Sequence, residues 1–126
     1  MIKVFIIDDS MIVRNALNKI LQYEQNIKVI GESANPVDAF EIFKKVGLPD
    51  VFILDIEMPK MDGLTFLKQI NKQNQIPVII CSTLVSDGSS SAIDSLRHGA
   101  LDIILKPRLN LKDFFNEQKE EIIRAI

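Results

Sequence analysis

Five short runs of apolar residues, separated by longer amphipathic stretches, most strongly limit how this chain can fold. The runs are rich in β-branched residues, and most do not alternate between apolar and polar positions. They occupy positions 4–7, 51–54, 78–81 and 103–105, with a weaker run at 27–30. Parallel strands covered by helices on both faces have this pattern, because neither face of such a sheet meets water. The sequence therefore predicts five buried, parallel strands.

Helical periodicity fills the gaps between these runs. In the first gap Ile12, Ala16 and Ile20 fall along one stripe of a helix, and polar residues take the other faces. The second gap has a similar apolar stripe, made of Ala39, Phe40, Phe43 and Val46. We expect each stripe to pack against the sheet.

Several residues typical of helix ends mark the boundaries of these segments. Asn35-Pro36 is typical of an N-cap followed by the first helical residue, and Gly47 suits the left-handed position just after a helix. Gly99 is expected to end a helix around 92–98, and Asn110 to cap a last helix over 111–126. The chain thus alternates five strands with five helices.

Five βα units with short connections predict one domain over residues 1–126, folded as a flavodoxin-like (βα)5 three-layer α/β sandwich. The predicted order of its parallel strands is 2-1-3-4-5, and the length of 126 residues leaves no room for a second ordinary domain. In such sheets, ligands bind at the carboxyl ends of the strands where the strand order reverses. We therefore expect the functional site beside the first and third strands.

Composition excludes several function classes. The formal net charge is −2, so no broad basic field is available for nucleic acid or an anionic membrane. Cys81 is the only cysteine, which excludes an internal disulfide and a cysteine-based zinc cluster. The N-terminal apolar run is too short for a signal peptide or a membrane span. These observations predict a cytoplasmic protein.

Three carboxylates are expected to meet at the predicted site. Asp8 and Asp9 follow the first strand and Asp55 follows the third, and these strands are neighbours in the predicted order. One aspartate after a strand often merely caps the next helix. Three that converge would repel one another without a cation, and an oxygen-rich site without histidine favours Mg²⁺.

Two further polar residues follow the other strands of the predicted edge. Ser82 comes directly after the fourth apolar run, and Lys106 directly after the fifth. A cation, an ammonium and a hydroxyl around a carboxylate suit phosphoryl transfer, because they spread the charge of the group in transit. We predict Asp55 as the nucleophile that takes the phosphoryl group.

At these positions the chain resembles the receiver domains of two-component response regulators, over essentially its whole length. The matching motifs are Asp8-Asp9-Ser10, residues 55–63 (Asp-Ile-Glu-Met-Pro-Lys-Met-Asp-Gly), Ser82 and Lys106-Pro107. The resemblance implies that a histidine kinase transfers its phosphoryl group to Asp55. It also implies Mg²⁺ ligation by Asp9, Asp55 and the backbone carbonyl of Glu57, with Asp8 acting through water. Ser82 and Lys106 would bind the phosphoryl oxygens, and the Lys106-Pro107 peptide would be cis.

Within this family, the chain is most similar to the N-terminal receiver domain of chemotaxis protein-glutamate methylesterases. The similarity lies in residues 55–59, 61–65, 81–84 and 99–102. It implies an output domain, the methylesterase itself, that is absent from this chain; the alternative is a stand-alone single-domain regulator. The implied output surface combines the helix around 92–98, the fifth strand and the last helix. Ile103 stands where many receivers carry an aromatic switch residue, so a switch of that kind is not expected.

Three other interpretations are weaker. A Mg²⁺-dependent phosphatase with an aspartate nucleophile would use Glu57 as its acid, but the chain lacks the usual Asp-x-Asp pattern and room for a substrate cap. An interaction module that cannot be phosphorylated would not need the intact acidic set. A serine hydrolase elbow at 88–92 does not follow a strand directly, and His98 suits a surface position near a helix end.

Overall fold

A five-stranded parallel sheet forms the centre of the computed structural model. The structure describes residues 1–55, 68–69, 76–83, 102–106, 117 and 119–126, and at 82–83, 102–106 and 125 it describes the backbone alone. The strands are ordered β2-β1-β3-β4-β5, and all four neighbouring pairs are parallel. This order confirms the predicted flavodoxin-like topology.

The strands coincide with the five apolar runs, and four of them are longer than predicted. They are β1 (Ile2–Ile7), β2 (Ile27–Ser33), β3 (Val51–Leu54), β4 (Val78–Thr83) and β5 (Asp102–Lys106). β4 continues through Ser82 instead of ending before it, and Lys106 is the last residue of β5. β2 continues through the polar residues Gly31, Glu32 and Ser33, because pairing with β1 holds them in the sheet.

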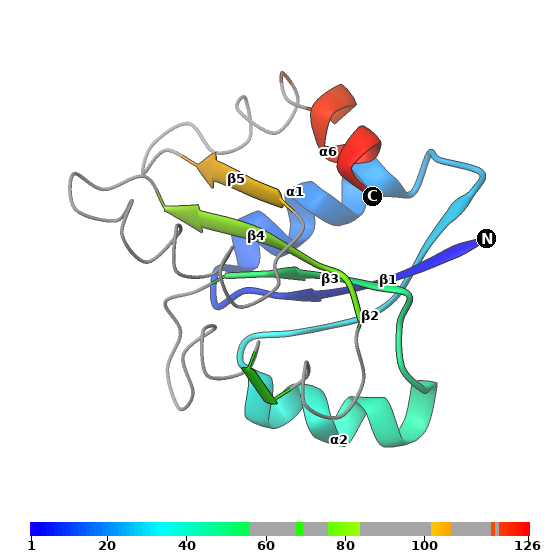
Figure 1. Cartoon of the computed structure of the whole chain (residues 1–126), viewed down its shortest axis with the longest axis vertical. Helices are drawn as coiled ribbons and strands as arrows, with labels where there is room; N and C mark the ends of the chain where they lie inside the picture. Colours follow the sequence, from blue (N-terminus) through cyan, green and yellow to red (C-terminus); the bar gives the residue numbers. More distant parts are fainter. Residues whose placement is uncertain (56–67, 70–75, 84–101, 107–116, 118) are drawn as a thin grey trace.

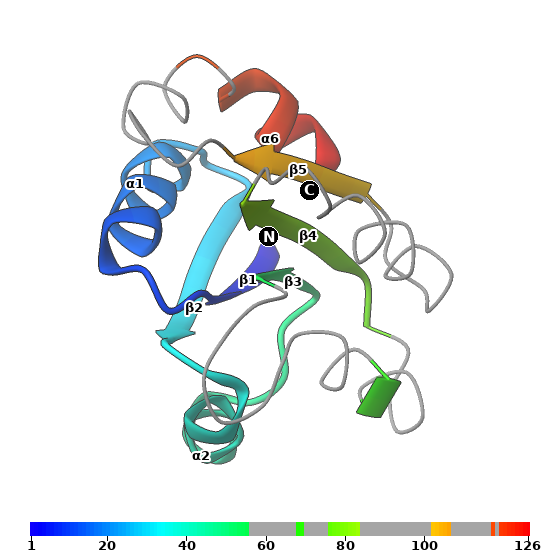
Figure 2. The same cartoon turned by 90° about the vertical axis from the view of Figure 1, so that its left-hand side faces the viewer.

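Helices cover both faces of the sheet, as Figures 1 and 2 show. α1 (Met11–Leu21) and α6 (Lys119–Ala125) lie on one face, and α2 (Pro36–Val46) lies on the other. Each face has its own apolar cluster, because alternate residues of a strand point to opposite sides. Val4 and Ile6 pack with α1 and Ile122, whereas Phe5 and Ile7 pack with α2. The three-layer arrangement thus follows from strands that are apolar on both sides.

The buried face of α1 differs from the predicted one. The prediction placed Ile12 on the packed stripe, but this side chain is 63% exposed, and Ala16 is only half-buried. The residues that pack on the sheet are Val13, Leu17, Ile20 and Leu21. Both stripes have helical spacing, so periodicity alone does not decide between them, and the packing of the helix on the sheet selects the second.

β1 and β2 pair with a shift in register that brings one glycine close to the core. Val4 lies opposite Val29, but Phe5 lies opposite Gly31, so the register skips Ile30. A Cβ atom added at Gly31 would lie 2.7 Å from Cε2 of Phe5. A side chain at this position would collide with a buried ring, which is why the strand needs glycine there.

The predicted ends of α2 are confirmed. Asn35 has extended backbone angles, and its side-chain oxygen accepts a hydrogen bond of 2.9 Å from the backbone N–H of Asp38, while Pro36 begins the helix. Gly47 ends the helix with φ +84°, and its N–H donates to the carbonyl of Phe43. Its ψ of −179° lies outside the usual left-handed helical region, in a conformation that glycine adopts readily.

Replacing Asn35 by alanine is expected to lower the free energy of unfolding by about 1 kcal/mol. The substitution leaves the N–H of Asp38 without its capping acceptor in a position where Asn35 itself is buried. Urea unfolding followed by far-UV circular dichroism measures the change. Asn15→Ala is the control, because Asn15 is exposed on α1; an equal loss in both variants would contradict the capping role.

Some predicted features lie outside the described residues: the helix end at Gly99, the cap at Asn110, the Lys106-Pro107 peptide and the start of the last helix. Within the described part of the last segment, α6 runs over Lys119–Ala125. No helix among the described residues is both long enough and apolar enough to cross a membrane.

Candidate metal and phosphoryl site

Three aspartates meet at the carboxyl ends of the two central strands β1 and β3. Asp8 and Asp9 follow β1, and Asp55 follows β3. Each offers a carboxylate oxygen, and these oxygens all lie within 4.8 Å of one another. Asp8 and Asp55 are buried, whereas Asp9 is exposed. The structure therefore brings together the three carboxylates named from the sequence and leaves one of them open to solvent.

Backbone pairing fixes where these aspartates lie. The N–H of Asp55 donates to the carbonyl of Ile7 at 2.9 Å, and the N–H of Asp8 donates to the carbonyl of Ser33 at 3.0 Å. These bonds extend the β3–β1 and β1–β2 ladders by one residue past the ends of the strands. The sheet thus sets the position of both buried aspartates before any ligand arrives.

The carboxylate of Asp8 also shapes the turn into α1. Its Oδ1 accepts a hydrogen bond of 2.9 Å from the backbone N–H of Ser10, and Ser10 in turn caps α1 by accepting from the N–H of Val13. This contact is a short local turn of the type that aspartate favours. Asp8 therefore has a structural task as well as a place in the acidic cluster.

The spacing of the carboxylates suits one small, hard cation. Oxygens bound to Mg²⁺ at about 2.1 Å lie roughly 3 Å apart when adjacent and about 4 Å apart when opposite. The 4.8 Å limit on the oxygens of the cluster is compatible with direct ligation or with one bridging water. A donor set made only of oxygen matches the preference of Mg²⁺. The residues present therefore fit a Mg²⁺ site.

Ser82 and Lys106 lie near the same ends of the neighbouring strands. Leu54, which precedes Asp55, is opposite Ile80 of β4, so Ser82 is two residues further along. Lys106 is opposite Thr83 at the end of β5. The backbone thus places both residues at the carboxyl edge of the sheet, as the sequence predicts. The predicted contribution of Glu57 lies outside the described residues, as do the serine cluster at 86–91 and His98.

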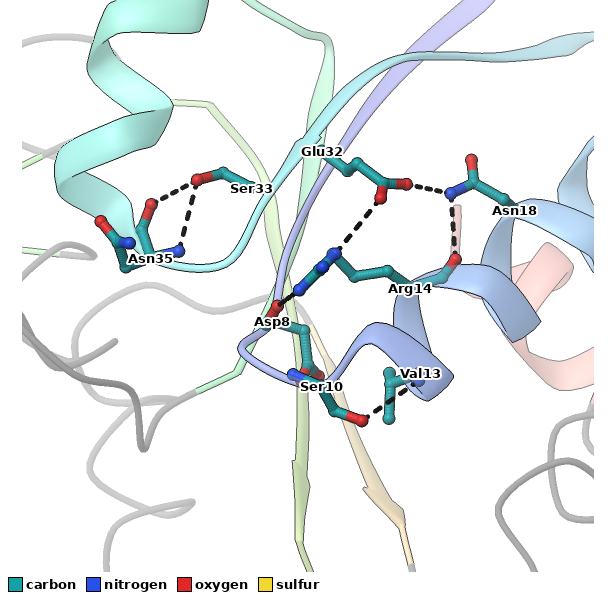
Figure 3. A network of polar contacts seen from close by, with 8 residues as sticks. All are labelled: Asp8, Ser10, Val13, Arg14, Asn18, Glu32, Ser33 and Asn35. Atoms are coloured by element: carbon teal, nitrogen blue, oxygen red, sulfur yellow. Dashed lines mark hydrogen bonds and ion pairs between the residues drawn. The ribbon is translucent and has the colours of Figure 1, made fainter.

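A polar network that the sequence analysis did not predict lies beside the acidic cluster (Figure 3). Arg14 of α1 forms an ion pair with Glu32 of β2, with 3.2 Å between Nε and Oε1. Its Nη1 donates to the backbone carbonyl of Asp8 at 2.7 Å. Asn18 donates to both Glu32 and the carbonyl of Arg14. The spacing of Arg14 and Asn18 by four residues shows that they share one helix face, but not that Glu32 faces them.

The fold and the acidic edge define a class of α/β protein: a doubly wound parallel sheet with a cluster of carboxylates at its switch point. The chain belongs to the response regulator receiver domains, because the model of that family matches residues 4–116.

Curated relatives narrow this assignment within the family. The chain is 47% identical, over all of its length, to protein-glutamate methylesterase/protein-glutamine glutaminase 3 of Shewanella oneidensis, and 49% identical to the protein of that name in Leptospira interrogans. The match covers 35% and 36% of those proteins, so the chain spans about a third of their length.

Solved structures agree with the sequence relatives. The response regulator domain of Thermotoga maritima CheB superposes with a TM-score of 0.85 at 34% identity, covering 98% of this chain and 92% of that one. The receiver domain of AraT, a response regulator from Geobacillus stearothermophilus, gives a TM-score of 0.72 at 27% identity, with 98% and 96% covered. The chain is thus a receiver domain that resembles the regulatory domain of CheB, as the resemblance in the sequence predicts.

Proposed function

We propose that this receiver domain accepts a phosphoryl group on Asp55 from the phosphohistidine of a histidine kinase, in a Mg²⁺-dependent reaction. The observation that carries the proposal is the cluster of Asp8, Asp9 and Asp55 at the ends of the central strands. Membership of the receiver family supports the identity of the donor.

The transfer replaces the N–P bond of the phosphohistidine by an O–P bond to Asp55. A carboxylate oxygen of Asp55 attacks the phosphorus atom, and an O–P bond forms as the N–P bond to the kinase imidazole breaks. The bond electrons stay on the imidazole nitrogen, which then takes a proton from water. The product is an aspartyl phosphate, a covalent intermediate that carboxylates are able to form. Water can later attack it to release inorganic phosphate and restore the carboxylate.

The other residues of the proposed site would stabilise charge. Asp9, Asp55 and the carbonyl of Glu57 would hold Mg²⁺, with Asp8 acting through water. When bound, the ion neutralises charge on the phosphoryl oxygens. Lys106 would place its ammonium, and Ser82 its hydroxyl, against the same oxygens once they arrive. The positions of both residues at the carboxyl edge of the sheet support these roles.

We propose chemotaxis as the setting of this signal. The similarity to protein-glutamate methylesterases supports a chemotaxis kinase as donor and a methylesterase domain as the output that phosphorylation regulates. The surface made by the predicted helix around 92–98, β5 and the last helix would transmit the change, and the protein would act in the cytoplasm. A stand-alone regulator that docks a separate partner through the same surface is the alternative.

Treatment with acetyl phosphate is expected to add one phosphoryl group to the chain when Mg²⁺ is present, and almost none when EDTA replaces it. The carboxylates repel the incoming anion unless a cation offsets their charge. Intact-mass spectrometry of samples quenched in acid within seconds measures the addition.

Three other results would contradict the proposal. Equal labelling with and without Mg²⁺ would overturn the role of the cation. Absence of any adduct, under conditions where a known receiver is labelled, would favour a binding module that is not phosphorylated. Sustained release of phosphate from many small phosphomonoesters would instead support the phosphatase interpretation.

A further inference from the structure

A partly buried arginine, Arg14, joins the first helix to the backbone of the acidic cluster. The side chain of Arg14 is 13% exposed, and its guanidinium reaches one group just after β1 and another on β2. Nη1 donates to the carbonyl of Asp8 at 2.7 Å, and Nε donates to Oε1 of Glu32 at 3.2 Å. Figure 3 shows the side chain extended between these two acceptors. One residue therefore connects α1, the end of β1 and β2.

The contact with Asp8 has a direct consequence for Asp9. The carbonyl of Asp8 and the N–H of Asp9 belong to one planar peptide group. A hydrogen bond that fixes the direction of this carbonyl therefore also fixes the orientation of the whole peptide group. The Asp9 side chain is attached next to that group, so its direction is restricted as well. Asp9 is the exposed member of the cluster, and among the described residues no hydrogen bond or ion pair orients its carboxylate instead. The peptide plane is thus the available means of aiming Asp9.

Glu32 and Asn18 hold the arginine in place. Glu32 accepts from Arg14 through one carboxylate oxygen and from Asn18 through the other, and Asn18 also donates to the carbonyl of Arg14. A guanidinium is a rigid, planar donor group, so two acceptors at different nitrogens restrict its orientation. Glu32 also balances the positive charge of Arg14 beside the proposed cation site.

We propose that Arg14 is a positioning residue that fixes the Asp8–Asp9 peptide group and so prepares Asp9 to bind the cation. The inference rests on the proposed Mg²⁺ site. It assigns to Arg14, with Glu32 and Asn18, a task that the motifs of the acidic cluster do not contain.

The direction in which the Kd for Mg²⁺ changes distinguishes a positioning role of Arg14 from a purely electrostatic one. Arg14→Met removes a positive charge near three carboxylates, so electrostatics alone predicts tighter binding of Mg²⁺. Positioning predicts the opposite, and loss of an outer-shell partner typically weakens metal binding by about 10-fold or more. We expect Arg14→Met to raise the Kd for Mg²⁺ about 10-fold. Arg14→Lys, which keeps the charge but not the planar fork, is expected to raise it several-fold.

The experiment is a Mg²⁺ titration of the unphosphorylated protein, followed by the amide resonances of Asp9 and Asp55 in ¹⁵N-labelled samples. The same spectra without Mg²⁺ show whether each variant is folded and whether the Asp9 amide has moved. Arg124→Met is the matched control, because it makes the same change at an exposed position of α6. If Arg14→Met fails to fold, Arg14→Lys and Asn18→Ala carry the test.

The outcomes separate this inference from the function on which it rests. Unchanged or tighter binding in the Arg14 variants, with normal binding by the native chain, overturns the positioning role and leaves the Mg²⁺ site intact. Equal weakening by Arg124→Met overturns it as well, because the effect would then not depend on the contact between Arg14 and the carbonyl of Asp8. A native chain that binds no Mg²⁺ overturns the proposed site and the inference together.

Discussion

Asp55→Asn is expected to abolish incorporation of a phosphoryl group from acetyl phosphate, while the native chain gains one group per molecule. An amide has nearly the shape of the carboxylate but lacks the anionic oxygen that attacks phosphorus. Asp55 is buried and its N–H pairs with the carbonyl of Ile7, and asparagine can keep that backbone bond. The substitution also removes one of three clustered negative charges, so we expect no decrease in Tm. Intact mass and thermal unfolding measure both effects.

Asp50→Asn is the matched control for this experiment. Asp50 is an exposed aspartate just before β3, whereas Asp55 is the buried one just after it. The side chain of Asp50 accepts from the N–H of Lys3, and an asparagine oxygen can do the same. Labelling of this variant should match the native chain. If the Asp55→Asn chain were labelled as fully as the native chain, the phosphoryl group would be attached to a residue other than Asp55.

Phe5→Ala is expected to lower the free energy of unfolding by about 3–5 kcal/mol, the range for large aromatic residues in a core. Phe5 is fully buried, and its ring packs edge-on against Phe43 and Phe52, with centroids 4.7 and 6.1 Å away. Gly31 approaches the same ring closely, so few atoms are free to fill the space left behind. Such a loss is a large share of the roughly 5–15 kcal/mol that stabilises a typical domain.

Urea unfolding followed by circular dichroism gives this free energy directly. Tyr23→Ala is the control, because the Tyr23 side chain is 75% exposed, and surface changes of this kind stay within about 0.5 kcal/mol. A loss below about 1 kcal/mol for Phe5→Ala would mean that the cluster on the α2 face of the sheet does not stabilise the fold as its packing indicates.

The strand order was predictable because it depends on features that are local in sequence. Runs buried on both faces, short connections and right-handed crossovers leave few arrangements of five strands. The polar end of β2 was not predictable in this way, since Gly31, Glu32 and Ser33 have no apolar pattern and join the sheet only by pairing with β1. The packed face of α1 was mistaken because Ile12 and Val13 begin two stripes of equal spacing.

The same distinction between local sequence features and packing applies to the candidate site. Asp8, Asp9 and Asp55 could be predicted together because each follows a strand, and neighbouring parallel strands end at one edge. The pairing of Arg14 with Glu32 could not, because it depends on how α1 lies against β2. A charged residue next to the packed positions Val13 and Leu17 was the available indication that Arg14 would need a partner.

The irregular pairing of β1 with β2 also affects how the molecule meets other molecules. β2 is an edge strand, and a straight, apolar edge is a template on which a second chain can add a strand and begin to aggregate. Here the skipped residue Ile30 interrupts the regular spacing, and Lys28 and Glu32 place charges along the edge. The same register shift that places Gly31 against the core therefore disfavours the addition of a further strand at this edge.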